Sequence, residues 1–319
     1  MAHELDMTTG QAAIAYVGQE PWHGLGQKLE EGASIETWTK AAGLDWAVNE
    51  AEVKFAISPG VVYSFPARKV LYRSDSATPL AVVSDGYQTV QPAEIMGFFN
   101  DLSLGTSAQL ETAGSLQGGK VIWALARLGE DFSIMDDKVA PYLMLSTSYD
   151  MSIPTIAKLV ATRVVCRNTI QLALSEKGAK QVRIPHSTKF DAQHARYELG
   201  IALDAFDEFK MRALKLSAQS FDMTAMDKFL LNLLQPTVGE IDGDQIRKSA
   251  AYKKITALFA GEQIGGSQDA VHNTAWGALN AVTEYIDHIK GRNQSARLQD
   301  AWFGVAASFK ARALDLISK

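Results

Sequence analysis

The sequence predicts an α+β protein: the N-terminal half is mostly antiparallel sheet with packed helices, and the C-terminal half is mainly helical. Two observations support this class. Residues 46–148 contain many short β-favouring segments separated by turn residues. Beyond residue 189, apolar residues recur at the three- and four-residue spacing of helices. In the middle of the chain a hairpin, a third strand and a helix predict a β-β-β-α-like core.

Composition limits the class of function. The chain has 319 residues, of which 47% are hydrophobic and 21% charged, as in ordinary globular proteins. Because the net charge is −5, binding to nucleic acid would need a local basic patch. The single cysteine excludes an internal disulfide framework and a multi-cysteine zinc site. With no export signal and no apolar run of about 18 residues, we expect a soluble cytoplasmic protein without a membrane segment.

Three regions are expected along the chain. Residues 1–20 have no clear period and predict a flexible arm, residues 21–180 an α+β domain, and residues 181–319 a helical region packed on that domain or extending from it. The first predicted helix begins after Ser34, a suitable N-cap, and ends at Gly43. Residues 46–55 then alternate between apolar and polar side chains, as in a strand.

More strands and one helix complete the N-terminal half. Strands are predicted at residues 61–65, 69–73, 80–84, 87–91, 108–113, 120–128 and 142–148. Pro92 begins a helix whose inward side chains are Ile95, Met96, Phe98 and Phe99. The glycine-rich segment 114–119 joins two of the strands as a hairpin loop. Residues 153–165 have mixed strand and helix character, and residues 169–174 predict a helix.

The C-terminal half is predicted as a series of helices. Their ranges are 189–216, 223–234, 242–259, 272–290 and 295–319, with breaks at Pro236 and in the segment 261–266.

The charge distribution is the clearest quantitative feature of the sequence. Residues 158–198 hold eight Lys or Arg against three acids, a local charge of +5 in a remainder of −10. Arg163 and Arg167 are four apart and would share one face of a helix. With Lys158 they form a stripe suited to neutralising phosphates. The alternative is that these are solvated charges balanced by acids elsewhere.

Other chemistry is less clearly indicated. Cys166 lies between arginines that would lower its pKa, with Asp150 or His186 as a base, but its apolar neighbours favour an inert buried thiol. The histidines are scattered, and no metal-binding, P-loop or dinucleotide motif occurs, so neither metal nor cofactor is predicted. Five side chains are candidates for stacking on unpaired bases, with core packing as the alternative: Trp22, His23, Tyr87, Trp123 and Tyr149.

Several motifs carry a family resemblance. They are PWHGLG, SDGYQTVQPAEIMGFFNDL, TAGSLQGGKVIWALARL, SYDMS with TRVVCRNTIQLAL, and WGALNAVTEYIDH. In this order, from about residue 20 to 316, they resemble the phage- and plasmid-like proteins of the domain of unknown function 932 family. Met151 stands where the family pattern has glycine. The resemblance implies a setting in phages, prophages and conjugative plasmids, and it implies no activity.

A second resemblance concerns architecture alone. The predicted hairpin, strand and basic helix resemble the core of single-strand annealing recombinases, which form rings or filaments. That likeness implies DNA-backbone contacts by Lys120, Arg127, Arg163 and Arg167. Lys158, Asn168 and Thr169 complete the set of candidate nucleic-acid-binding residues.

The leading hypothesis is therefore a non-enzymatic, homo-oligomeric protein of a mobile element that binds single-stranded DNA and anneals complementary strands without ATP. Two alternatives stay open. One is a protein-interaction or anti-defence factor with a host or phage protein as partner and no nucleic-acid role. The other is an enzyme that depends on Cys166.

Overall fold

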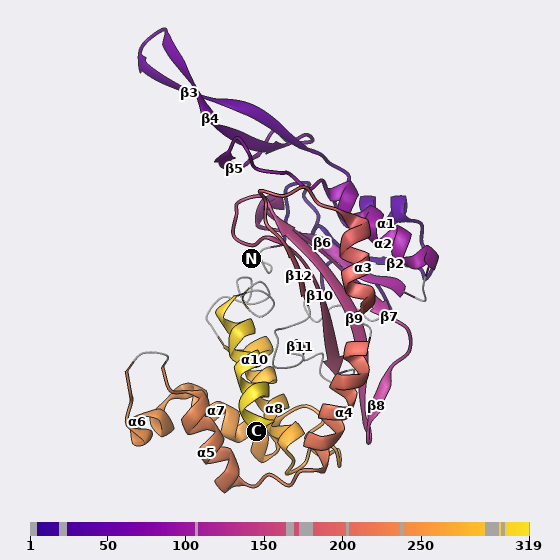
Figure 1. The fold of residues 1–319 in the computed structure, drawn as a ribbon, viewed down its shortest axis with the longest axis vertical. Coiled ribbons are helices and arrows are strands. Elements are labelled where there is room, and N and C mark those ends of the chain that lie inside the picture. The colour runs from indigo at the N-terminus through magenta and orange to yellow at the C-terminus, as the bar shows by residue number, and fades with distance from the viewer. Residues whose placement is uncertain are drawn as a thin grey trace. The chain divides into compact units, whose positions relative to one another are not determined.

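The computed structural model describes residues 5–18, 24–105, 108–163, 169–171, 181–201, 204–236, 239–290, 300 and 304–318. It confirms an α+β protein with a sheet-rich N-terminal half and a mostly helical C-terminal half (Figure 1). The chain forms two compact units. Unit 1 comprises Met1–Gly129, Leu143–Lys158 and Gln181–Ile201, and unit 2 comprises Glu130–Tyr142, Leu159–Lys180 and Ala202–Lys319. The units alternate along the chain, whereas the sequence predicted one boundary near residue 180.

In the main sheet of unit 1 the strands β10, β9, β7, β6, β1 and β2 are neighbours in this order, and β12 pairs with β10. Its strands are β1 (Ile14–Val17), β2 (Gln27–Leu29), β6 (Ala108–Leu116), β7 (Val121–Leu128), β9 (Asp137–Ser148), β10 (Thr155–Arg163) and β12 (Gln181–Ile184). Strands β9 and β10 contribute residues to both units. Strand β1 lies within the expected flexible arm, yet it pairs with β2 and β6 and its first three residues are buried.

Helices α1 (Ile35–Ala41), α2 (Pro92–Gly105) and α3 (Ala192–Ile201) complete the core of unit 1. The Ser34 hydroxyl accepts a hydrogen bond from the Thr37 N–H, as the predicted N-cap should. Helix α2 packs on β6 and β7. Its four predicted inward side chains are all buried, because their spacing places them on one face.

A separate three-stranded sheet in unit 1 comprises β3 (Val48–Ser58), β4 (Val61–Arg73) and β5 (Pro79–Ser84). Strand β4 runs through Pro66 as one element, although the sequence predicted two strands there. Strand β5 pairs only with residues 68–72 of β4, so the far part of the β3–β4 hairpin is two-stranded. This hairpin, called the ribbon below, extends away from α1 and α2 (Figure 1). The predicted strand at 87–91 is absent, since these residues form no ladder.

Unit 2 is mostly helical. Its helices are α4 (Asp204–Ala218), α5 (Met223–Leu233), α6 (Gly243–Lys248), α7 (Ala250–Ala257), α8 (Ala275–Glu284) and α10 (Val305–Ile317), with π-helical turns η2 (Leu258–Glu262) and η3 (Tyr285–Ile289). Every residue of α8 is buried, and this helix contacts α4, α7 and α10. Strands β8 (Phe132–Ile134) and β11 (Thr169–Gln171) pair with the unit 2 parts of β9 and β10.

The structure also resolves predicted segments in the middle and the C-terminal half of the chain. Residues 169–171 form strand β11 where a helix was predicted, and residues 172–174 lie outside the described residues. The mixed segment 153–165 contains a strand, β10, which is rich in β-branched residues and lies between neighbouring strands. The helix predicted at 189–216 corresponds to α3 and α4, with residues 202 and 203 outside the described residues. The helix predicted at 242–259 is divided because Ser249 is extended and caps α7.

Candidate functional site

Three loops of unit 1 meet at one end of its main sheet. The ring of Tyr87 stacks on the imidazole of His186, with 4.5 Å between centroids. The Tyr87 hydroxyl donates to the Ser148 carbonyl at 2.6 Å. The Nε2 atom of His186 lies 2.8 Å from the Ile153 carbonyl. These contacts join the segment after β5, the β9–β10 loop and the segment after β12, and we call this region the loop junction.

The electrostatics of the loop junction favour neutral side chains. Burial raises the pKa of Tyr87, and the nearby Asp150 raises it further. Burial also lowers the pKa of His186, although its hydrogen bond to Ile153 and the charge of Asp150 act in the opposite direction. Tyrosine and histidine are therefore both neutral at pH 7. Asp150 and His186, two members of the predicted enzyme set, do lie near each other, while Cys166 lies outside the described residues.

A buried ion pair supports the neighbouring β6–β7 loop. The guanidinium of Arg73 binds the carboxylate of Asp6, and both side chains are almost completely buried. The guanidinium carbon also lies 4.3 Å from the centroid of the Trp46 ring. Gly119 has φ of 94° and packs against Arg73 so closely that a β-carbon would lie 2.9 Å from its Nη1. This loop, with Gln117–Gly119 as the 3-10 turn η1, therefore depends on glycine.

Met151 adopts an unusual backbone conformation in the β9–β10 loop. Its φ is 64°, in the left-handed region that favours glycine, and its side chain is exposed. This is the position where the resemblance led us to expect glycine. The loop therefore keeps a glycine-type backbone angle in the presence of a methionine side chain.

The structure distinguishes between base stacking and core packing for three of the five aromatic candidates. Tyr87, Trp123 and Tyr149 are buried, so the core-packing interpretation is confirmed for them. The edge of Tyr149 contacts the ring of Trp46 at a centroid distance of 5.9 Å. Trp22 and His23 lie outside the described residues.

The predicted basic residues whose side chains the structure describes, Lys120, Arg127 and Lys158, do not lie together on one surface. Lys120 directly precedes β7 and Arg127 lies near its end, about 23 Å away at roughly 3.3 Å per residue. Lys158 is buried in β10. Arg163 is the last residue of the same strand rather than part of a helix. Arg167 and Asn168 lie outside the described residues, and Thr169 begins β11.

Lys120 is the member of that set nearest the loop junction. Its carbonyl accepts a hydrogen bond from the N–H of Tyr149 at 2.7 Å, which joins the β6–β7 loop to the β9–β10 loop.

Exposed aromatic side chains instead gather on the ribbon. Phe55, Tyr63 and Phe65 are 47%, 49% and 46% exposed. Phe55 and Tyr63 are cross-strand partners whose rings stack at 5.7 Å with an interplanar angle of 25°. Large aromatic rings normally lie in a core or an interface. The pair therefore presents a flat apolar surface to solvent.

Basic side chains flank these rings. The Lys54 side chain is 59% exposed, and its ammonium lies 3.5 Å from the carboxylate of Glu52 at the surface. The Arg68 side chain is exposed and makes no hydrogen bond or ion pair with a described residue. Glu52 pairs with Lys69 but Lys54 pairs with Ser64, so four residues of β4, one of them Arg68, lie opposite Val53 alone. This irregularity opens a hollow of about 360 Å³ that Arg68 lines. Lys69 is engaged, since its ammonium binds Glu50 and the Tyr87 carbonyl.

The sequence contains a charge signal at the ribbon. Residues 53–74 contain four basic residues and no acid, in a chain whose net charge is −5. Arg73 accounts for one of these charges internally. The alternation of residues 46–55 predicts a strand but does not show whether another layer covers it. In the structure, nearly all residues in the far part of the hairpin are exposed.

Comparison with known proteins gives one match. The sequence model of a family described as a domain of unknown function (DUF932) matches residues 79–302, a region that begins at β5 and leaves the ribbon outside. No curated protein and no solved structure matches the chain. Every helix that the structure describes is too short or too polar to span a bilayer. Within the same residues, no group of three His, Cys, Asp or Glu side chains is arranged to hold a metal ion.

Proposed function

The chain belongs to the family described as a domain of unknown function (DUF932), and from that premise we propose that it binds single-stranded DNA through the ribbon of unit 1. The observation that carries the proposal is the exposed, stacked pair Phe55–Tyr63 within a stretch that has basic residues and no acids. The setting implied by the family resemblance is a mobile genetic element, where single strands arise during replication and transfer.

Stacking supplies the apolar part of the proposed interaction. Every base has a flat face, so an aromatic ring binds unpaired bases with little regard to sequence. The rings of Phe55 and Tyr63 are held by a cross-strand pairing, which leaves little conformational entropy to lose on binding. Phe65 adds a third exposed ring beside the hollow at the strand irregularity.

Electrostatics supplies the part directed at phosphates. Lys54 and Arg68 lie on the two strands of the ribbon and extend into solvent. Two phosphate contacts on single-stranded DNA correspond to a slope of about −1.4 in a plot of log K against log salt. Since Lys69 is bound to Glu50, we expect it to contribute less than the other two cations.

Fluorescence anisotropy with labelled oligothymidylate at several salt concentrations tests this proposal. We expect the double variant Phe55→Leu/Tyr63→Leu to weaken binding by about tenfold or more, because stacking contributes about 1–3 kcal/mol per base. Leucine keeps the surface apolar, so loss of affinity would be due to the rings. Val62→Ala is the matched control, since Val62 is exposed on the same ribbon but pairs with Ala56.

Two results would overturn the proposal. One is an absence of binding at low salt, and the other is equal affinity of the leucine double variant and the unchanged protein. Lys54→Ala and Arg68→Ala should each reduce the magnitude of the salt slope by about 0.7.

Annealing without ATP and assembly into a homo-oligomer are finer parts of the same proposal. They are tested by mixing complementary strands that carry a fluorophore and a quencher, and by sedimentation of the protein with and without DNA. A monomer that binds strands but does not speed their pairing would limit the function to binding.

A second candidate function is protein binding by the same ribbon. Ile57, Val61 and Val62 are exposed aliphatic side chains, and such side chains fit a protein partner better than a base. In this case the leucine double variant would keep its partner. Substitution of Ile57 and Val62 by Ser would remove that partner without affecting DNA.

A further inference from the structure

The outer edge of β3 carries backbone groups that pair with no described residue. Strand β3 is at the edge of the three-stranded sheet, where β4 is its neighbour. The N–H of Val48 donates to the Gln91 side chain and the Val48 C=O accepts from it, so both groups point away from β4. Because these groups alternate in direction along a strand, those of the even-numbered residues in Glu50–Ala56 point the same way. None of them binds a described residue, so they form an open edge of the kind that accepts another strand.

This open edge is regular and has defined ends. At one end, the Gln91 side chain occupies the place of a neighbouring strand beside Val48. At the other end, a bulge inserts Ile57 between two ladder pairs of β3 and β4. The irregularity opposite Val53 adds residues to β4 and none to β3. The open edge is therefore Glu50–Ala56, and Val53 is its middle residue.

The side chains of the open edge are complementary to a second copy of the same edge. If two copies pair antiparallel about a twofold axis through Val53, Glu52 of each lies directly opposite Lys54 of the other. These two side chains are 70% and 59% exposed, and their contact within one chain spans 3.5 Å at the surface, so it is exchanged at little cost. Moving the axis to either neighbouring residue would place Glu52 opposite Glu52 or Lys54 opposite Lys54. The charges therefore favour the one register that uses the whole open edge.

We propose that β3 pairs with β3 of a second copy of this chain, so that the two three-stranded sheets become one continuous sheet. The outward backbone groups of Glu50–Ala56 then bind each other across the axis. Residues directly opposite share a face of a sheet, so Phe55 and Tyr63 of both copies lie on one face and the charge pairs on the other. The partner is thus another molecule of this chain, and the face with the rings stays open. This interface does not depend on DNA binding.

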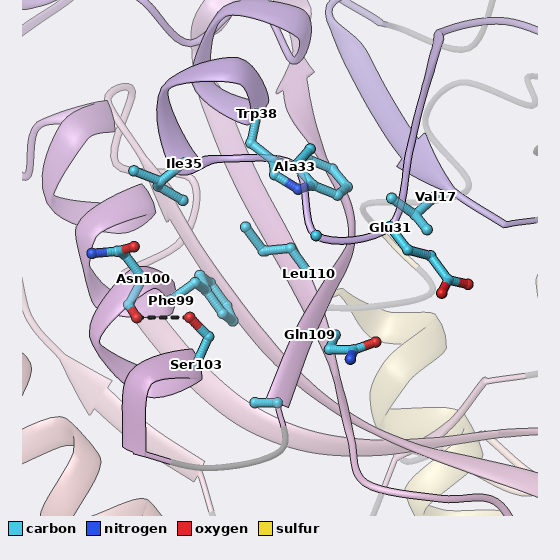
Figure 2. Close-up of a pocket in the computed structure, with 12 residues that line it drawn as sticks. Val17, Glu31, Ala33, Ile35, Trp38, Phe99, Asn100, Ser103, Gln109 and Leu110 are labelled. Atoms are coloured by element: carbon cyan, nitrogen blue, oxygen red, sulfur yellow. Dashed lines mark hydrogen bonds between the residues drawn. The ribbon is translucent and has the colours of Figure 1, made fainter.

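Sedimentation equilibrium of the complete protein over a range of concentrations measures the association. Because the paired edge is short, we expect a reversible dimer. Glu52→Lys and Lys54→Glu each place like charges opposite each other at both pairs, so each should raise the dimer dissociation constant by about tenfold or more. Glu31→Lys is the matched control and should leave that constant unchanged. Glu31 is an exposed acid beside the cavity at the turn before α1 (Figure 2), and its replacement changes the net charge as much as Glu52→Lys does.

A mixture of the two single variants tests the register itself. A Glu52→Lys chain opposite a Lys54→Glu chain again has opposite charges at both pairs, so the mixture should dimerise as the unchanged protein does. The double variant Glu52→Lys/Lys54→Glu should do the same on its own. Ala56→Pro tests the backbone pairing, because it removes one outward N–H and leaves the ladder to β4 intact. We expect this variant to have an unchanged circular dichroism spectrum and to be a monomer.

Three results would overturn the inference. The first is a protein that stays monomeric at the highest concentration at which it is soluble. The second is a dimer that neither single variant nor Ala56→Pro weakens, because its interface would then lie elsewhere. The third is a mixture of the two single variants that associates no more tightly than either variant alone. These measurements contain no DNA, so their outcome is separate from that of the proposed function.

Discussion

Individual residues at the loop junction and the adjoining β6–β7 loop hold backbone angles that most side chains avoid. Gln117, Gly118, Gly119 and Met151 all have φ between 55° and 94°. Glycine adopts such angles without a steric penalty, but Gln117 and Met151 have a β-carbon that makes them unfavourable. Surrounding contacts must therefore maintain these conformations. The packing of Gly119 under Arg73 and the hydrogen bond from Tyr149 to Lys120 are two such contacts.

Replacement of Met151 by glycine should stabilise unit 1. The left-handed angle costs a residue with a side chain about 1 kcal/mol, and the exposed methionine loses little packing when it is removed. We expect a gain of about 0.5–1 kcal/mol, measured as a higher denaturant midpoint with an unchanged slope. Met151→Ala keeps the β-carbon and should show no gain. Equal stability of the glycine and alanine variants would contradict the strain.

The ion pair between Arg73 and Asp6 predicts a large and specific loss of stability. Burial disfavours the Asp6 carboxylate, but hydrogen bonds from Thr8 and the contact with Arg73 outweigh this and lower its pKa. Arg73→Met leaves that carboxylate buried without its cation, which costs about 3–5 kcal/mol. The double variant Asp6→Leu/Arg73→Met removes both charges and should recover part of the loss in urea unfolding. Additive losses would show that the two residues act independently.

At the scale of elements, the features that depend on apolar spacing and on helix caps could be predicted from the sequence. Helix α1 began after Ser34 as expected, and α2 buried its predicted face. Strand β11 was predicted as a helix because residues 169–174 lack alternation, and its pairing with β10 depends on a distant segment. The exposure of Phe55 and Tyr63 could not be predicted from the local sequence either. The sequence of a strand with apolar side chains is the same whether or not another layer of the protein covers them.

Helices α5 and α6 are joined by an ion pair with a defined pH response. Hydrogen bonds from Arg247 and Tyr252 lower the pKa of Asp227 to about 2. Because the folded-state pKa is below the ordinary value of 3.8, the contribution to stability is complete above that value and disappears as the pH falls toward 2. We expect Asp227→Asn to be less stable than the unchanged protein at pH 6, with a difference that shrinks between pH 4 and pH 2. Thermal unfolding monitored across this range measures it, and a constant difference would exclude the linkage.

At the scale of the whole molecule, the two units alternate along the chain. The path enters unit 2 at residue 130, returns at 143, leaves at 159, returns at 181 and leaves again at 202. Unit 1 therefore needs β12 and α3, which follow the boundary predicted near residue 180. Composition indicated the size of the protein, but it could not show this alternation, because contacts between distant segments decide which residues form a compact unit.

The alternation predicts how shortened chains behave. A chain that ends at residue 201 retains every segment of unit 1, whereas one that ends at residue 180 lacks the strand paired with residues 155–158. We expect the longer one to give well-dispersed amide resonances and resistance to limited proteolysis, and the shorter one to give neither. If the two shortened chains resisted proteolysis equally, unit 1 would not need β12 and α3 in order to fold.

The absence of a covering layer on the ribbon also affects how its sequence can vary over evolution. Residues 53–67 bury almost nothing within unit 1, so folding places little constraint on which side chains they carry. Selection at these positions is then exerted almost entirely by whatever the ribbon touches. A library of substitutions can be scored separately for protein abundance and for binding. In residues 53–67, substitutions should reduce binding without reducing abundance, whereas in the strands of the main sheet they should reduce both. The ribbon is thus a segment where specificity can change without loss of the folded protein.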